Sequence, residues 1–457
     1  AASKVADPRA EQAPLAVSDA EAKKKAQVLR LLLANIGQSV LQHVINLQSE
    51  IALISAACNG DVAETARNMT ATSTLAGLVG LLFNQIGGKL SDAVGRKPFL
   101  LAGPVSNLLI GLLVYARPKN LRLLFITRIL KFIGTTFSGT VMTGASTVDL
   151  LQDEKGPIVD QYNAKVPVVV GIAVVVGPFL ESLVQKLSGG RAHMTYLALS
   201  AIAAVQLLQN AFQVPETLPP AKRISMSEVT ASIASINPFA FLKIYTSNNA
   251  MLKKVVTITT LQNFLDGRCT SDVFQMWARN NLKWPLETIR NYVSLWGGCS
   301  VASGVLQMII ASKLSLWTYT VFTSLCVGSA LTIQGLKPRG IYMWAALPVV
   351  LPGVNAGTAL MLKRVQMNVA VSSGVGQGEF SAWVNNMRGL ATALAPWIYG
   401  QWYAFCEKNG LYSGTVWPLA GFAGAILPLA IFCTSSNAAY EEAGRPTEPE
   451  GPEGKKP

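Results

Sequence analysis

Long apolar runs, separated by short polar stretches, recur along most of this chain. Each run is about 20 residues long, which is the length of helix that crosses ~30 Å of hydrocarbon. Since a barrel strand would alternate polar and apolar residues over about 10 positions, the runs predict continuous membrane-spanning helices. Six runs come before a polar stretch and six after it, at residues 27–50, 70–90, 99–117, 121–145, 164–186, 193–214, 254–278, 289–312, 314–336, 340–362, 375–405 and 414–435.

The polar stretches divide the chain into five parts. An Ala/Pro-rich tail at residues 1–26 and a Pro/Glu/Gly-rich tail at 436–457 are predicted to be disordered. Between them we expect a six-helix bundle at 27–215, a cytoplasmic linker at 216–253 and a second six-helix bundle at 254–435. The predicted fold class is an all-α membrane protein with twelve transmembrane helices in two bundles.

The composition agrees with a membrane protein and argues against several classes of function. Of the 457 residues, 50% are hydrophobic and 14% are charged, whereas about 25% are charged in a typical soluble domain. With two histidines and no CxxC pair, the chain offers little for a zinc site or a catalytic triad. We therefore expect no enzyme, no metal and no cofactor. Much of the net charge of +13 lies in short loops between spans, so we also expect no nucleic-acid partner.

An even number of spans places both termini on the same side of the membrane. Lys and Arg are more frequent near the span ends on that side, which predicts that both termini are cytoplasmic, or face the stroma or matrix in an organelle. The Ala/Pro-rich leader makes an organellar membrane, such as that of a plastid, one interpretation. An endomembrane or the plasma membrane is equally open.

Polar residues on the first predicted span fall on one helical face. They are spaced three or four positions apart, at Asn35, Gln38, Gln42, Asn46 and Glu50. Inside a membrane such a row must face protein or water. It is therefore either the wall of a solute cavity or a set of hydrogen bonds between helices.

The fourth span contains two cations, Arg128 and Lys131. Each costs ~2.5–3.5 kcal/mol at the bilayer centre, so we expect both to face a water-filled cavity or an acidic partner. The alternative is that their side chains reach the membrane surface.

Acidic and amide side chains on later spans complete the predicted cavity. Gln262 and Asp266 share a face of the seventh span, and Asn355 lies in the tenth. Glu50 and Asp266 are the candidates for proton coupling, because the charge of a carboxylate depends on whether the cavity opens it to water or buries it. The alternative is that Asp266 forms a static ion pair and that Glu50 lies at the interface.

The segment from 87 to 100, between the second and third spans, reads GGKLSDAVGRKPFL. Its glycine pair predicts the end of the second helix, and the later glycine permits a tight reversal. Its acid and two bases can pair with one another at the membrane edge. The residues with these properties are Gly88, Asp92, Gly95, Arg96 and Lys97.

This segment resembles the signature loop between helices 2 and 3 of the major facilitator superfamily. In the fifth span, Gly171, Gly177 and Pro178 resemble the antiporter motif of the drug–proton antiporter branch, although Glu181 and Ser182 replace the glycine pair that follows in that branch. The motifs are most similar in style to tetracycline-type exporters. The resemblance implies two pseudo-symmetric bundles that rock around a central cavity, with the loop as a cytoplasmic gate.

The leading hypothesis is secondary active transport of a small solute by alternating access. Export in exchange for protons is what the antiporter resemblance implies. The expected partners are the small-molecule solute, protons and the lipid bilayer, and we expect a monomer. The alternative is a non-transporting facilitator fold that serves as a structural or receptor subunit of a larger complex. The second half of the chain favours this alternative, because only residues 313–315 match the signature loop there. The positions that correspond to Asp92 and Arg96 carry no charge.

Overall fold

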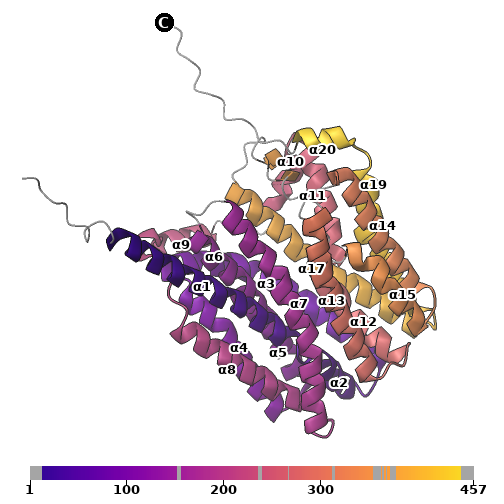
Figure 1. Ribbon diagram of the computed structural model, residues 1–457. Coiled ribbons are helices and arrows are strands. Elements are labelled where there is room, and N and C mark those ends of the chain that lie inside the picture. The colour runs from indigo at the N-terminus through magenta and orange to yellow at the C-terminus, as the bar shows by residue number, and fades with distance from the viewer. Residues whose placement is uncertain are drawn as a thin grey trace, which may run out of the picture.

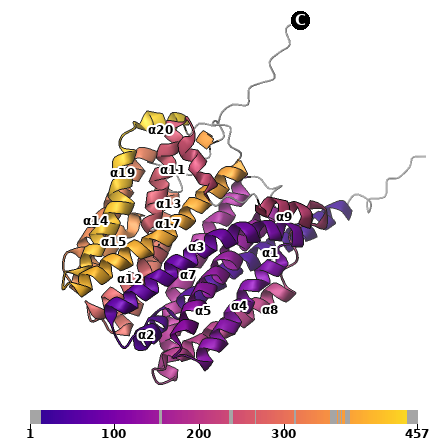
Figure 2. The ribbon, with the colours of Figure 1, turned by 180° about the vertical axis from the view of Figure 1, so that it is seen from behind.

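The computed structural model describes residues 13–151, 156–234, 239–265, 267–310, 314–353, 362, 365, 366, 368–370 and 377–443. Within these residues the regular structure is helical and contains no strand. Figures 1 and 2 show the helices in two groups, one from the first half of the chain and one from the second.

The first six predicted spans correspond to long helices. The second span is α3 (Val62–Val94), the third is α4 (Lys97–Ala116) and the fifth is α7 (Gly156–Leu187). The other three consist of several consecutive elements: α1 (Ala13–Val44) with α2 (Leu47–Ala57); α5 (Leu121–Thr136) with the π-helix η1 (Phe137–Met142) and α6 (Thr143–Leu151); and η2 (Ala192–Met194) with α8 (Thr195–Phe212).

The second half repeats this arrangement after a partly helical linker. The linker contains η3 (Pro220–Lys222), α9 (Met226–Ala234), η4 (Ala240–Leu242) and α10 (Lys243–Thr246). The membrane elements that follow are α11 (Ala250–Gln262), η5 (Asn263–Leu265), α12 (Gly267–Asn280), α13 (Leu286–Ile310), α14 (Leu316–Gly335), α15 (Gly340–Val350), η6 (Leu351–Gly353), α17 (Gln377–Lys408), η7 (Ser413–Thr415), α18 (Val416–Gly421), η8 (Phe422–Ile426) and α19 (Leu427–Phe432). A short helix, α20 (Asn437–Ala443), follows them.

Three details differ from the sequence predictions. Helical structure extends into both tails that were predicted to be disordered, since α1 begins at Ala13 and α20 covers Asn437–Ala443. The first and seventh spans are not continuous helices, because α1 ends before Asn46 and α11 gives way to the short η5. A break of this kind frees backbone groups, which need partners inside the protein. The glycine pair at 87 and 88 does not end a helix either, since α3 continues to Val94. Gly87 is tolerated there because the Phe137 ring occupies the space of its missing side chain.

The outer surface of the helices is apolar, as a lipid-facing surface must be. On α4, Leu109 and Leu113 are 54% and 50% exposed, and on α7 Ile172 and Leu183 are 54% and 51% exposed. Six segments among the described residues are both long and apolar enough to cross a membrane: Glu21–Ala57, Lys97–Ala116, Val168–Leu187, Ala192–Phe212, Leu316–Gly335 and Ser413–Phe432.

The two halves pack through α3 against α17 and α7 against α13. Gly77 lies against Ala393, and Gly400 lies against Thr70, so small residues let the two backbones come close together. In both Figures 1 and 2 the halves lie together at the end of the molecule where α2 and α12 are found. They diverge toward the end that carries α9 and α20.

Candidate functional site

Four charged side chains meet inside the protein, where the halves come together. Lys131 Nζ lies 2.9 Å from Glu50 Oε2, and Arg128 Nη1 lies 3.2 Å from Glu50 Oε1. On its other side, Arg128 Nη2 lies 2.6 Å from Asp272 Oδ2. We call Glu50, Arg128, Lys131 and Asp272 the central charge cluster. It contains two cations and two acids, and this neutrality is what allows all four to be buried.

Local helix geometry places these groups. Arg128 and Lys131 are three residues apart on α5, so they project from one face. Asn46, at the break between α1 and α2, accepts a hydrogen bond from Lys131 Nζ at 2.9 Å, and Glu50 follows in the first turn of α2. The side chains of Lys131 and Glu50 are each 3% exposed. The sequence prediction that both cations need water or an acid is met here by Glu50 and Asp272.

The cluster also joins the two halves of the molecule. Asp272 belongs to α12, whereas Arg128 belongs to α5 and Ser73 to α3. Ser73 Oγ donates to Asp272 Oδ2 at 2.7 Å and accepts from Arg128 Nη2 at 2.9 Å. A separation of α12 from the first half would break the contacts of Asp272 with Ser73 and with Arg128, so the arrangement can act as a gate at this end of the protein.

The inner part of the polar row on α1 contacts neighbouring helices of its own half. Asn35 donates to Thr143 at 2.6 Å and accepts from Gln206 at 2.7 Å. Gln42 donates to Gln206 at 2.6 Å and accepts from Asn107 at 2.7 Å. Asn35 and Gln42 are fully buried. These contacts are the interhelical hydrogen bonds of the second interpretation, and a solute-lining role for the two residues stays a prediction.

The other predicted cavity residues have varied positions. Gln38 is half-buried and donates to Gln209 on α8 at 3.1 Å. Gln262 is buried near the end of α11. Asp266 and Asn355 lie outside the described residues, so their predicted roles stay predictions.

The predicted gating loop is a tight turn between α3 and α4. Gly95 has φ +114°, a backbone conformation that side-chain-bearing residues rarely adopt. The turn brings Arg96 Nη1 within 2.6 Å of Asp92 Oδ1, and Arg96 Nε within 3.0 Å of Asp149 on α6. Gly88 lies inside α3, away from the turn.

Glu216, just after α8, closes this turn from the other side. Its carboxylate accepts from the backbone amides of Arg96 at 2.8 Å and Lys97 at 3.1 Å. Partial burial alone would raise the pKa of Glu216, but hydrogen bonds from the amides of Leu218, Arg96 and Lys97, together with Arg223, hold it below its usual value. These contacts tie the loop to its own half and to the segment that leads into the linker. The gating role of the loop stays a prediction.

The segment that resembles the antiporter motif lies where α7 is closely packed. A side chain at Gly171 would collide with Val301 of α13, and one at Gly177 would collide with Val44 of α1. Pro178 borders a small cavity. Gly171 thus permits close approach between the halves, and Gly177 permits it within the first half.

Sequence reasoning did not identify two of the functional side chains. Asp272 was not singled out from the sequence, although the two cations on the fourth span need acidic partners or water. Glu181 was noticed as a replacement in the antiporter motif. In the structure its carboxylate accepts from the Ser49 amide at 2.6 Å, which satisfies part of the break in the first span.

Comparisons with known proteins agree with this geometry. The family described as Major Facilitator Superfamily matches residues 51–396. The hippocampus abundant transcript 1 proteins of Mus musculus and Homo sapiens are each 24% identical over 335 residues. The aligned part covers 71% of this chain but only 63% of the length of these relatives.

Several solved transporters have a similar fold. The human organic anion transporter MFSD10 (TETRAN) is 15% identical with a TM-score of 0.62, covering 89% of this chain and 99% of that one. A D-xylose–proton symporter is 12% identical with a TM-score of 0.65, covering 92% of this chain and 98% of the symporter. At these identities the likeness concerns the fold alone.

Proposed function

Because this chain belongs to the major facilitator superfamily, a family of multi-pass membrane transporters rather than enzymes, we propose that it exports a small solute by alternating access, in exchange for protons. The tetracycline-type antiporter branch is part of this proposal. The antiporter-like residues Gly171, Gly177 and Pro178 support it, and so does the position of the two glycines at closely packed helix contacts.

The observation that carries the proposal is the contact between Arg128 and Asp272. It joins the halves at one end through a buried ion pair of 2.6 Å, while the halves diverge at the other end. Alternating access requires such a contact to form in one state and break in the other. We assign the central charge cluster to this gate and to the floor of the solute path.

Glu50 is the described carboxylate best placed for proton coupling. It forms ion pairs with both Arg128 and Lys131, so its protonation would change the charge of the cluster by one. Exchange requires that solute and proton compete, which a solute that pairs with the Glu50 carboxylate would do. An anionic solute would instead bind better once Glu50 is protonated, and both would then move in one direction. Asp266 stays the second candidate.

The test is flux in proteoliposomes with an imposed pH gradient. The panel should contain cations, neutral solutes and organic anions, the last because one structural neighbour is named an organic anion transporter. We expect a solute to move in the direction opposite to the flow of protons. Glu50→Gln should abolish this gradient-driven flux, while solute–solute exchange continues. Flux of solute and protons in the same direction would overturn export by exchange. Absence of any flux would favour the non-transporting subunit.

The proposed orientation places both termini in the cytoplasm, or on the stromal or matrix side of an organelle. The excess of Lys and Arg near span ends on that side supports it. In this orientation the ion pair of Arg128 and Asp272 closes the non-cytoplasmic side. Protease protection of a tag on the C-terminus in sealed vesicles tests it, and cleavage from the non-cytoplasmic side would contradict it.

A further inference from the structure

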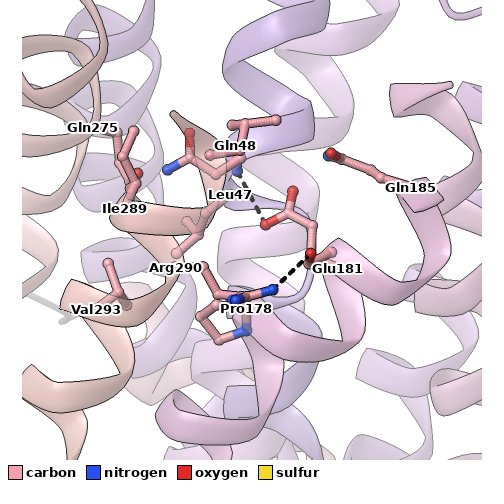
Figure 3. Close-up of a pocket in the computed structure, with 11 residues that line it drawn as sticks. Leu47, Gln48, Pro178, Glu181, Gln185, Gln275, Ile289, Arg290 and Val293 are labelled. Carbon is pink, nitrogen blue, oxygen red and sulfur yellow. Dashed lines mark hydrogen bonds between the residues drawn. The ribbon is translucent and has the colours of Figure 1, made fainter. Parts of the chain in front are cut away.

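A small cavity of about 30 Å³ lies between the two halves (Figure 3). Gln48 of α2 and Glu181 of α7 border it from the first half, and Gln275 of α12 and Arg290 of α13 border it from the second. One water needs about 10–15 Å³ of such volume, so the cavity holds about two waters. It is too small for an organic solute.

Two of the amide side chains that border the cavity, those of Gln48 and Gln275, are buried and have atoms without partners among the described residues. The Gln48 side chain is 8% exposed, and within the described part of the chain neither of its amide atoms has a hydrogen-bond partner. Gln275 is 3% exposed, and its Oε1 is likewise without a partner there. Each such group costs about 1–3 kcal/mol unless something polar reaches it. The cavity is therefore built for a polar occupant.

Glu181 is a buried carboxylate that pairs with hydrogen-bond donors of α2. Ser49 donates to Glu181 Oε1 from its amide at 2.6 Å and from its hydroxyl at 2.7 Å. The backbone N–H of Gln48 donates to Oε2 at 3.3 Å. Among the described residues no cation forms an ion pair with it.

Other charged and titratable groups lie around Glu181. Lys131 of α5 and Tyr196 of α8 interact with it electrostatically, and Glu50 is the residue that follows Ser49 on α2. Arg290 borders the same cavity and donates to Ser182 at 3.0 Å. A metal cation in the cavity would meet the Arg290 guanidinium, and an anion would meet Glu181. Water and a proton are the occupants that fit both the charges and the volume.

We propose that Glu181 is a second proton-binding site, in which the protonated carboxyl donates a hydrogen bond into the cavity and, through the water there, reaches Gln275 Oε1 across the interface. The proton comes from a hydronium ion that reaches the cavity, which forms an O–H bond with the carboxylate and leaves a water molecule. Protonation thus turns a group whose described hydrogen bonds lie within its own half into a donor toward the other half. Proton binding then favours the state in which the halves are closed at this end.

This inference goes beyond the proposed function and needs neither a solute nor flux to be tested. In nanodiscs, the infrared carbonyl band of a protonated carboxyl is followed against pH for the unmodified chain and for Glu181→Gln. We expect one component of the carbonyl band, that of Glu181, to appear as the pH falls and to be missing from Glu181→Gln. The matched control is Glu64→Gln, which removes an exposed acid at the start of α3 and should leave the titration unchanged.

A second measurement reads the contact between the halves. Spin labels in place of Lys119 and Lys337, both exposed in loops on the closed side, report the distance across the interface. Lowering the pH should raise the ratio of closed to open states by about five-fold, the effect of one added hydrogen bond. Gln275→Leu should remove this shift but keep the infrared band.

The outcomes separate cleanly. A band that persists in Glu181→Gln, or a pH shift that persists in Gln275→Leu, would overturn the inference. Since neither readout involves transport, a failure of the flux experiment would leave this result standing, and the reverse also holds.

Discussion

Replacing Asp272 with Asn tests whether the central charge cluster holds the two halves together. The change keeps the size and hydrogen-bonding capacity of the side chain and removes its charge. Asp272 is 6% exposed and its Oδ2 lies 2.6 Å from Arg128 Nη2, so Arg128 would lose its only described partner from the second half.

The expected magnitude follows from the charges that remain. After the change the cluster has two cations and Glu50 alone, which gives a buried net charge of +1. Breaking a buried ion pair by removing one partner costs about 3–5 kcal/mol. We take the lower end, about 3 kcal/mol, because Arg128 keeps Glu50 at 3.2 Å. The cost applies only while the halves are closed at this end, so the closed-to-open ratio should fall about 10²-fold.

Distance distributions between spin labels at Lys119 and Lys337 measure this ratio. The native cysteines must be replaced first, because six are present. Ser73→Ala is the matched control, since it removes a hydrogen bond of 2.7 Å to the same carboxylate without changing any charge. It should cost about 1 kcal/mol, which corresponds to about a five-fold change.

Two results would refute this reasoning. One is an unchanged distance distribution in Asp272→Asn. The other is an equal effect of Asp272→Asn and Ser73→Ala, which would mean that hydrogen bonding, and not charge, holds the gate.

Three further predictions concern the rest of the described site. Gly95→Ala should destabilise the fold by more than the ~1–2 kcal/mol that a left-handed backbone costs a residue with a side chain, because the new Cβ would also collide with Glu216. The control is Gly60→Ala, since Gly60 has φ +80° but lies in open space, so that only the backbone cost applies. Equal thermal midpoints of the two variants would disprove the collision. The pKa of Glu216 is lower in the folded protein than in the unfolded chain, where it is about 4.3. Its ionised carboxylate therefore stabilises the fold at pH values above the unfolded pKa, and this stabilisation is lost as the pH falls through the folded pKa. Thermal scans between neutral and acidic pH should therefore show a smaller acid-induced loss in Glu216→Gln, and an unchanged loss would contradict the assignment. Lys131→Met should lower the free energy of unfolding by about 3 kcal/mol, because it leaves excess negative charge in the cluster. Adding Glu50→Gln should restore part of this free energy in unfolding experiments. No recovery would show that Lys131 and Glu50 are not coupled.

The sequence was sufficient for the path of the chain through the membrane. Apolar runs of this length have few alternatives to helices, because unpaired backbone groups are too costly in hydrocarbon. Runs such as 99–117 and 193–214 therefore lie close to the helices α4 and α8 of the structure. The same argument identified Arg128 and Lys131 as groups that need acidic partners or water, since two buried charges stand out against an apolar span.

The breaks in the first and seventh spans could not be predicted in this way. Asn46 differs little from the other polar residues of its row by sequence. The helix can stop there because Glu181 accepts from the backbone amides of Gln48 and Ser49 that the break frees. Lys131 donates to the Asn46 side chain at the same point, and both partners come from other helices.

What the sequence determined by itself was the approximate position and helical type of the membrane spans, and which charges could not face lipid. What only the tertiary structure decided was the pairing: Asp272 with Arg128 across the two halves, Gln42 with Gln206 and Asn107 within one half, and Glu181 with the start of α2. The physical reason is range. Hydrophobic periodicity acts within a single helix, whereas an ion pair or hydrogen bond joins residues up to 199 positions apart, as in Ser73 and Asp272, and depends on how the helices pack.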